Sequence, residues 1–178
     1  MLEAFSAPFD NINAFLLAGG NVLVVIMITT FVMWMLVVER LIYFASANAA
    51  VKKRALRAWD ARTDHQSWYA HAVRDKLISE VSMSNNANIG LIKALVAVSP
   101  LLGLLGTVTG MVEVFDVLAV TGSSNARLMA GGITKATIPT MAGLVASLSG
   151  ILSLNIIELQ AKRSVSDVAN RLVIGREG

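Results

Sequence analysis

The chain has 178 residues, of which 55% are hydrophobic and only 15% are charged, and its net charge is +3. A water-soluble domain of this length needs more charged side chains to cover its surface, so the composition indicates a membrane protein. No cysteine is present, which excludes disulfides and thiolate metal sites within this sequence. The two histidines, His65 and His71, lie in a polar segment without further metal ligands, and we expect neither a metal ion nor a cofactor.

The N-terminal segment, residues 1–19, has an amphipathic pattern. Its apolar residues Phe5, Phe9, Ile12 and Leu16 follow one another at intervals of four, three and four, which places them on one face of a helix. The pattern predicts a helix lying on the outer (periplasmic) surface of the membrane, and a frayed hydrophobic tail is the alternative. We do not expect a cleaved signal peptide, because the segment contains no Lys or Arg and the following apolar stretch is longer than a signal core.

Three later stretches are apolar enough to cross a membrane, which takes about 20 residues of helix. None of them alternates with a period of two, as a strand of a membrane barrel does. The predicted spans are residues 20–44, 93–121 and 132–158. Between and after them we predict a helical cytoplasmic segment at 45–92, a periplasmic link at 122–131 and a cytoplasmic tail helix at 159–178. The predicted fold is an all-α membrane protein with helical cytoplasmic extensions.

The basic residues set the predicted orientation, because Lys and Arg concentrate on the cytoplasmic side of a membrane. None precedes the first span, whereas the segment between the first two spans and the tail are rich in them. These residues are Lys52, Lys53, Arg54, Arg57, Arg62, Arg74 and Lys76, followed in the tail by Lys162, Arg163, Arg171 and Arg176. The N-terminus is therefore predicted outside the cytoplasm and the C-terminus inside, and we expect no nucleic-acid partner.

The cytoplasmic part is predicted to be helical and short. It has about 40 residues between the first two spans and about 20 after the third, too few for an independent catalytic domain, and we expect no enzyme activity. Within it, the polar run Ser82–Asn88 is predicted to break the helix.

Small residues mark one face of the second and third spans. They recur at intervals of three, one and three in the second span and of three, four and three in the third, and so lie along one side of each helix. The set is Gly103, Gly106, Thr107 and Gly110 in the second span, and Thr140, Gly143, Ser147 and Gly150 in the third. Such residues let helix backbones approach closely in lipid. Because the chain has only three spans, we expect some of the neighbouring helices to belong to other copies of it.

Each of these two spans also contains a proline, Pro100 or Pro139, which removes a backbone hydrogen bond. The nearest hydroxyls belong to Ser99, Thr137 and Thr140. One interpretation is structural: these hydroxyls satisfy the carbonyls that the prolines leave free. The other is functional: Thr107 and Thr140 line an internal pore, where a hydroxyl can hold water without burying a charge. The spacing of the residues does not decide between them.

Acidic residues are absent from the depth of all three spans. Glu113 and Asp116 lie at the outer end of the second span, where an interfacial position is expected. A proton-driven membrane protein needs a titratable carboxylate at membrane depth. If protons cross here, a partner must supply that carboxylate.

Two segments resemble the signatures of the MotA/TolQ/ExbB proton channel family. The first is SPLLGLLGTVTGM at 99–111 with Phe115, and the second is GITKATIPTMAGL at 132–144 with the later Asn155. Three spans are typical of the ExbB and TolQ branches, whereas MotA-type stators have four. The chain most resembles a short ExbB.

The resemblance implies a symmetric homopentamer in the bacterial inner membrane. Its second and third spans would surround two single-span ExbD-like subunits, each with one membrane aspartate, and Thr107 and Thr140 would be the pore-lining threonines. Proton flow would drive a TonB-like protein for outer-membrane uptake of iron complexes or similar ligands, with membrane lipid around the complex. The alternatives are a TolQ-like subunit for outer-membrane integrity and a non-conducting scaffold. A small secondary transporter is disfavoured, because the sequence shows neither internal repeats nor a midplane polar site.

Lys135 departs from the pattern of the family, whose members usually carry an acidic residue at this position. Its charge could pair with Glu113 of the next subunit, or the side chain could extend outward to the interface. A proton role of this position in the family is therefore not carried over to the chain.

Overall fold

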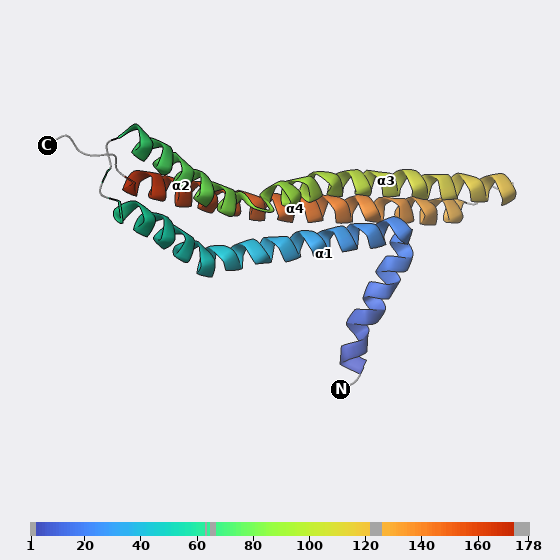
Figure 1. Cartoon of the computed structure of the whole chain (residues 1–178). Coiled ribbons are helices and arrows are strands. Elements are labelled where there is room, and N and C mark those ends of the chain that lie inside the picture. The colour runs from blue at the N-terminus through green and yellow to red at the C-terminus, as the bar shows by residue number, and fades with distance from the viewer. Residues whose placement is uncertain (1–2, 63, 65–66, 122–125, 173–178) are drawn as a thin grey trace. The chain divides into compact units, whose positions relative to one another are not determined.

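The structure, a computed structural model, describes residues 3–62, 64, 67–121 and 126–172, and the side chains of residues 19–62, 64, 67–120 and 129–172. It contains four helices: α1 (Glu3–Asp60), α2 (Trp68–Asn86), α3 (Ile89–Thr121) and α4 (Ala126–Arg171), as Figure 1 shows. The described chain is helical almost throughout, which confirms the predicted all-α fold. The positions of the two predicted cytoplasmic segments and of the link stay predictions.

Three of the described helices contain a stretch long and apolar enough to cross a membrane, and these stretches lie in α1, α3 and α4. Large apolar side chains on them remain exposed within the single chain, for example Phe31 at 70%, Leu101 at 64% and Val145 at 69%. Exposed apolar surface of this extent indicates contact with lipid or with further protein. The presence of three apolar helices is therefore confirmed, whereas the bounds of the spans stay predictions.

Helix α1 changes direction at Gly20, close to the predicted start of the first span. This residue has φ 68° and ψ −168°, a backbone conformation that only glycine adopts without strain. The predicted apolar face of Phe5, Phe9, Ile12 and Leu16 lies outside the residues whose side chains are described.

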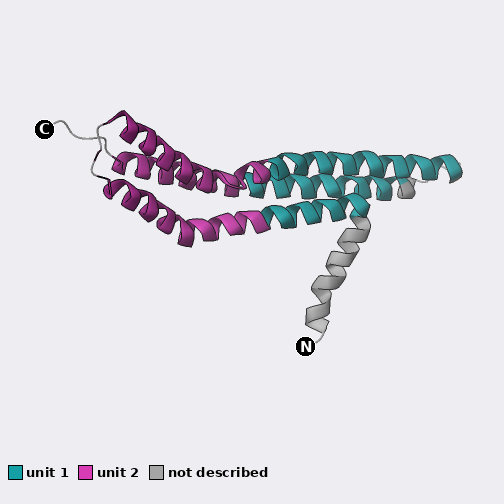
Figure 2. Cartoon of the chain, in the orientation of Figure 1, with its two compact units in different colours: residues 1–34, 94–151 teal, residues 35–93, 152–178 magenta. Residues whose placement is uncertain are grey.

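The chain divides into two compact units, which Figure 2 colours separately. Unit 1 consists of Met1–Trp34 and Ala94–Ile151, and it is built from parts of α1, α3 and α4. Its buried apolar residues come from all three helices and are Leu23, Ile26, Met33, Val96, Val114, Ala136 and Ala146. Unit 1 is thus a small three-helix bundle in which α3 packs directly on α4.

Unit 2 consists of Met35–Lys93 and Leu152–Gly178. Its main apolar cluster contains Ala55, Trp59, Ala70, Leu77, Val81, Val168 and Leu172, from α1, α2, α4 and the residue after α4. Arg74 of α2 adds two hydrogen bonds to the end of α4, with Nε donating to Leu172 O at 2.8 Å and Nη2 to Ala169 O at 3.1 Å. The described part of unit 2 is therefore a packed bundle rather than a set of separate helices.

The break between α2 and α3 is shorter than the sequence predicts. The run Ser82–Asn88 was expected to interrupt the helix as a whole, but α2 continues to Asn86, and only Ala87 and Asn88 separate it from α3. Asn86 stabilises the last turn, since its Nδ2 donates to Ser82 O at 2.9 Å. Asn88 has φ 61°, a conformation that asparagine tolerates better than most residues. The prediction of a seven-residue break was therefore wrong, because polar side chains bond within the helix here.

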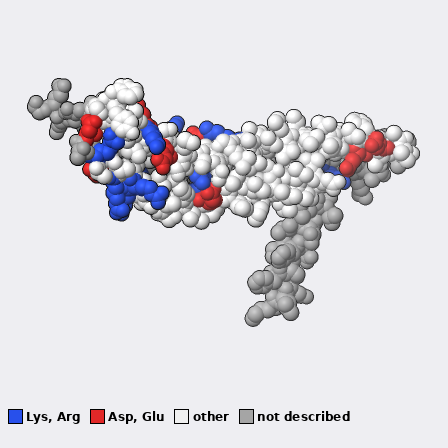
Figure 3. Space-filling model, viewed as in Figure 1, with Lys and Arg blue, Asp and Glu red and all other residues white. Residues whose placement is uncertain are grey.

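Charged side chains are unevenly distributed over the two units. On the face shown in Figure 3, they gather over unit 2 and at one end of unit 1, whereas the rest of unit 1 is uncharged on this face. The same division is visible in the sequence, where no Asp, Glu, Lys or Arg occurs in 94–112 or 136–157. This pattern is expected of a protein whose uncharged stretches lie in the hydrocarbon core of a membrane.

Candidate functional site

The candidate site lies where α3 and α4 approach each other most closely in unit 1. A Cβ atom placed on Gly143 would lie only 2.5 Å from the carbonyl oxygen of Ser99, and one on Gly103 would lie 3.0 Å from the Cα of Thr140. Gly110 likewise faces the backbone and side chain of Ala136. No side chain fits at these positions unless the backbones move apart, so the glycines bring the two helices together.

The remaining small residues of the predicted packing face also contact the chain itself. Gly106 faces Pro139 and Val22, Gly150 faces Met33 and Val96, and Ser147 is buried with only 6% exposure. Part of this packing was predicted to occur between different copies of the chain. In the structure, the small residues bring helices of one chain together.

The two predicted pore threonines lie opposite each other across this contact. Thr140 Oγ1 donates a hydrogen bond to Gly103 O at 2.8 Å, across the helix interface, and lies 3.5 Å from Thr107 Oγ1. The latter distance is too long for a strong bond between hydroxyls. Thr107 Oγ1 donates instead to Leu104 O of its own helix at 2.7 Å. Both residues are half-buried.

The hydroxyl of Ser99 does not bond to the carbonyl that Pro100 leaves free, contrary to the structural interpretation. Pro100 cannot bond to the carbonyl of Val96, four residues earlier, and this carbonyl accepts a hydrogen bond from Ser147 Oγ of α4 at 3.1 Å. Ser99 Oγ donates to Leu95 O at 2.8 Å instead.

The same holds around Pro139, which leaves the carbonyl of Lys135 without its helical partner. Thr137 Oγ1 donates to Thr134 O at 2.9 Å, and the hydroxyl of Thr140 bonds to the other helix. Neither Thr137 nor Thr140 therefore bonds to the freed carbonyl. The structural interpretation is therefore wrong for these two hydroxyls, because each of them bonds to a different carbonyl.

At the other end of this bundle, Lys135 and Glu113 form an ion pair. Lys135 Nζ lies 3.1 Å from Glu113 Oε2, and both side chains are substantially exposed. The pair joins α4 to α3 within one chain, whereas the sequence analysis expected it between subunits. Pairing between neighbouring subunits stays a prediction. The pair also borders a polar cavity of about 300 Å³, which Thr109, Gly110 and Gly20 line together with it.

Sequence reasoning missed a polar cluster around Arg40 in unit 2. This arginine is only 6% exposed, and its Nη2 lies 2.6 Å from Glu39 Oε1. Its Nη1 donates to Ser84 O at 3.3 Å, and its guanidinium carbon lies 4.9 Å from the centre of the Tyr43 ring. Asn88 completes the cluster, because its Nδ2 donates to Glu39 Oε2 at 3.0 Å. The sequence signal for this cluster was the pair Glu39-Arg40, which ends an apolar run and lies one helical turn before Tyr43.

Only one of the two histidines lies among the described residues. His65 lies outside the described residues, and His71 is exposed on α2. Among the residues that the structure describes, no three His, Cys, Asp or Glu side chains are grouped as metal ligands.

Taken together, the helices and the site define a polytopic α-helical membrane protein with a hydroxyl-bearing contact between two tightly packed spans. Comparison with known sequences makes the assignment more specific. The sequence model of the MotA/TolQ/ExbB proton channel family matches residues 45–170, and the chain belongs to this family.

Individual relatives are similar over shorter stretches. The chain is 35% identical over 88 residues to the biopolymer transport protein exbB1 of Vibrio cholerae, which covers 49% of the chain and 39% of that protein. It is 38% identical over 68 residues to a putative ExbB-like biopolymer transport protein of Synechocystis, covering 37% of the chain and 32% of the relative. It is also 32% identical over 74 residues to the Tol-Pal system protein TolQ of Haemophilus influenzae, covering 42% of the chain and 32% of the relative. The chain thus spans less than two fifths of the length of each of these relatives.

Proposed function

We propose that this chain is the ExbB-like subunit of a proton-driven motor in the bacterial inner membrane. The observation that carries the proposal is the pair of hydroxyls, Thr140 and Thr107, across the close contact of two spans that contain no carboxylate at depth. Membership of a proton channel family supports it.

In the proposed mechanism, the chain supplies the ring and a partner supplies the titrating group. Five copies surround the single-span helices of two ExbD-like subunits, whose aspartates carry the protons past the threonines. Each proton that moves down the membrane potential releases about 2.3 kcal/mol per 100 mV. A TonB-like protein uses this energy for outer-membrane uptake of iron complexes or similar ligands.

Two alternatives make different use of the same surface. A TolQ-like subunit would work for outer-membrane integrity, and identities of 35% to an exbB protein and 32% to a TolQ protein are too close to separate the branches. A non-conducting scaffold would need the threonines for helix packing alone, which the bond from Thr140 to Gly103 O also satisfies.

The experiment compares two substitutions of one residue in cells that lack their own copy of the protein. Thr140→Val removes the hydroxyl and keeps the shape, whereas Thr140→Ser keeps the hydroxyl. A single hydrogen bond between membrane helices is worth about 0.6 kcal/mol on average, so we expect both variants to assemble. Growth on an iron complex imported through the outer membrane should be lost in T140V and retained in T140S.

The outcomes separate the three functions. Unchanged growth and unchanged detergent resistance of T140V, with normal assembly, support the scaffold. Normal iron uptake with increased sensitivity to detergents supports the TolQ-like function. Native mass spectrometry of the complex, expressed with its genomic neighbours, tests the assembly itself, and five copies with two of a single-span partner is the expected mass.

A further inference from the structure

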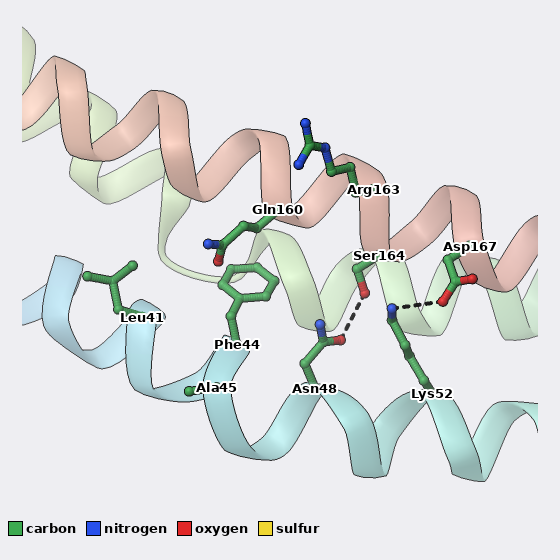
Figure 4. A pocket seen from close by; sticks show the side chains of 9 residues that line it. All are labelled: Leu41, Phe44, Ala45, Asn48, Lys52, Gln160, Arg163, Ser164 and Asp167. Carbon is green, nitrogen blue, oxygen red and sulfur yellow. Dashed lines mark hydrogen bonds and ion pairs between the residues drawn. The ribbon is translucent and has the colours of Figure 1, made fainter.

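Unit 2 contains a groove between α1 and α4 that the proposed function does not use. It has a volume of about 520 Å³ and is lined on the α1 side by Phe44, Asn48 and Lys52, and on the α4 side by Gln160, Arg163 and Asp167. Figure 4 shows these side chains, with Phe44 and Gln160 toward one end of the groove and Lys52 and Asp167 toward the other. We call it the α1–α4 groove.

The groove lies at a change in the surface of unit 2. Before it, α1 and α4 expose large apolar side chains, of which Ile42 is 61% exposed and Leu159 is 54% exposed. After these two residues, neither helix exposes a large apolar side chain in its described part. Basic residues follow on both helices, ten positions after Ile42 on α1 and three after Leu159 on α4. They are Lys52, Lys53, Arg54, Arg57, Lys162 and Arg163. An apolar surface that gives way to positive charge is what the boundary of a membrane requires.

Several polar groups in the groove have no partner in the described chain. The guanidinium of Arg163 and the amide of Gln160 form no hydrogen bond or ion pair among the described residues, and Figure 4 shows Arg163 at the α4 rim, pointing away from α1. Asn48 accepts a hydrogen bond from Ser164 Oγ at 2.9 Å through its Oδ1, so its Nδ2 donors face the same space.

The charged end of the groove is only partly neutralised. Lys52 Nζ lies 3.0 Å from Asp167 Oδ2, and Asp167 also accepts from Arg171 Nε at 3.1 Å. One carboxylate is therefore shared between two cations, and Arg163 adds a third positive charge that no described carboxylate balances. The site has the donors and the positive charge that a phosphate requires.

We infer that the α1–α4 groove binds the headgroup of an anionic phospholipid. The phosphate would lie between Asn48 and Lys52, where the exposed side chain of Arg163 can turn in from the α4 rim, and the glycerol backbone would lie beside Gln160 and Phe44 toward the exposed apolar surface. The change from an apolar to a basic end favours a lipid over a free anion, since a free anion gains nothing from the apolar end. This inference does not rest on the proposed motor function.

The test measures lipid retention by native mass spectrometry of the full chain in a neutral detergent. Phosphatidylglycerol and phosphatidylcholine with the same acyl chains are added in turn, and we expect preferential retention of the anionic lipid at one molecule per chain. Arg163→Gln should weaken the binding of phosphatidylglycerol about fivefold, the effect of about one basic residue near an anionic lipid. The matched control is Lys53→Gln, which removes the same charge from an exposed position outside the groove and should leave binding unchanged.

Two further variants test the groove without removing a basic residue. Ala45→Phe fills it beside Phe44 at unchanged charge and should abolish retention of the lipid. Asp167→Asn removes the competing carboxylate and should strengthen retention.

Each of three results would overturn the inference. The first is equal retention of the two lipids, and the second is an equal loss in K53Q and R163Q, which would indicate attraction by the overall charge alone. The third is displacement of phosphatidylglycerol by inorganic phosphate at equal concentration, which would identify a site for a free anion.

Discussion

A hydroxyl that already makes one hydrogen bond is not thereby excluded from a second role. Thr140 Oγ1 uses its single proton to bond to Gly103 O, but its two lone pairs remain able to accept. The same holds for Thr107, whose proton goes to Leu104 O. A role in helix packing and a role in lining a pore are therefore compatible for these threonines. A hydroxyl held by its own chain presents a fixed acceptor to water or to a partner.

The bond from Ser147 to the carbonyl freed by Pro100 leads to a prediction of coupling. Ser147→Ala should lower the free energy of unfolding in detergent by about 0.6 kcal/mol and at most by about 1.7 kcal/mol, the average and the largest value for bonds between membrane helices. In the Pro100→Ala background, the carbonyl of Val96 regains a backbone N–H, and the same substitution should cost measurably less. A double-mutant cycle on thermal unfolding measures the difference.

The control for this cycle is Thr29→Val. Thr29 Oγ1 donates to Val25 O of its own helix at 2.8 Å, a carbonyl that no proline affects. Its effect should be small and the same with either residue at position 100. Equal costs of S147A in both backgrounds would show that the freed carbonyl does not depend on the serine.

Asp167 leads to a prediction about pH. The hydrogen bond from Lys52 is the main cause that lowers the pKa of this carboxyl, and Arg171 lowers it further. Because the pKa is lower in the folded than in the unfolded chain, the pair stabilises the fold above the unfolded value of about 3.9 and loses this contribution as the pH falls below it. The carboxylate is 41% exposed, so the effect should be about 1 kcal/mol or less.

The measurement is the melting temperature between about pH 6 and pH 3, the range that brackets the usual aspartate pKa. Asp167→Asn should melt lower than the wild type at pH 6, and the gap should close toward pH 3. Glu80→Gln serves as the control, because Glu80 forms no ion pair among the described residues and its removal should leave the acid dependence intact. A constant gap between D167N and the wild type would refute the assignment to this pair.

At the scale of the helices, the contact between α3 and α4 depends on glycine at a few positions. A methyl group on Gly143 would meet the carbonyl oxygen of Ser99 at 2.5 Å and the Cα of Gly103 at 3.2 Å. Both are backbone atoms, which cannot rotate away as the end of a side chain can. We therefore expect Gly143→Ala to separate the helices and to lower the free energy of unfolding by about 1–3 kcal/mol, as overpacking of cores does.

Gly131 of the same helix provides the matched control. Apart from its chain neighbours and the adjacent backbone of its own helix, no described atom lies within 4 Å of the position that its Cβ would occupy. Gly131→Ala should leave stability unchanged or raise it slightly, because alanine favours helix by about 1 kcal/mol over glycine. The two variants differ only in position, so equal stability of both in detergent would contradict the packing that the structure shows.

For the whole molecule, the sequence was sufficient to predict features that depend on amino-acid composition and on the helical spacing of residues. Three uncharged stretches of sufficient length specify three helices in lipid, and residues such as Gly103 and Gly143 recur at helical spacing. The sequence did not reveal which residue each glycine or charged side chain contacts. A glycine indicates that some backbone comes close, but not whether it belongs to the same chain, and Lys135 likewise gave no indication that Glu113 of its own chain lies within reach.

Polar groups buried by tertiary contact were the least predictable. Arg40 follows an apolar run, where a basic residue usually marks the membrane boundary. In the structure, however, its guanidinium bonds to Ser84 O and lies over the ring of Tyr43. Ser147 was predicted as a packing residue, and its bond to Val96 O requires the register of α4 on α3. These features depend on contacts between residues far apart in the chain, which a pattern within one segment cannot specify.

The orientation of the chain in the membrane is the last prediction, and the absence of cysteine makes it directly testable. Single cysteines can be introduced at Ser79 in the segment between the first two spans and at Val120 near the end of α3, both exposed in the structure. Because basic residues concentrate on the cytoplasmic side, a maleimide that cannot cross the inner membrane should label V120C and not S79C in cells with a permeabilised outer membrane.

Lysis with detergent before labelling provides the control, since both cysteines should then react. Labelling of S79C in intact cells would invert the predicted topology. It would also move the α1–α4 groove to the periplasmic side of the membrane, because residues 45–60 and 159–171 would lie there together with Ser79. An inverted topology would thus place the groove at the other lipid leaflet, whereas the packing of α3 on α4 would be unaffected.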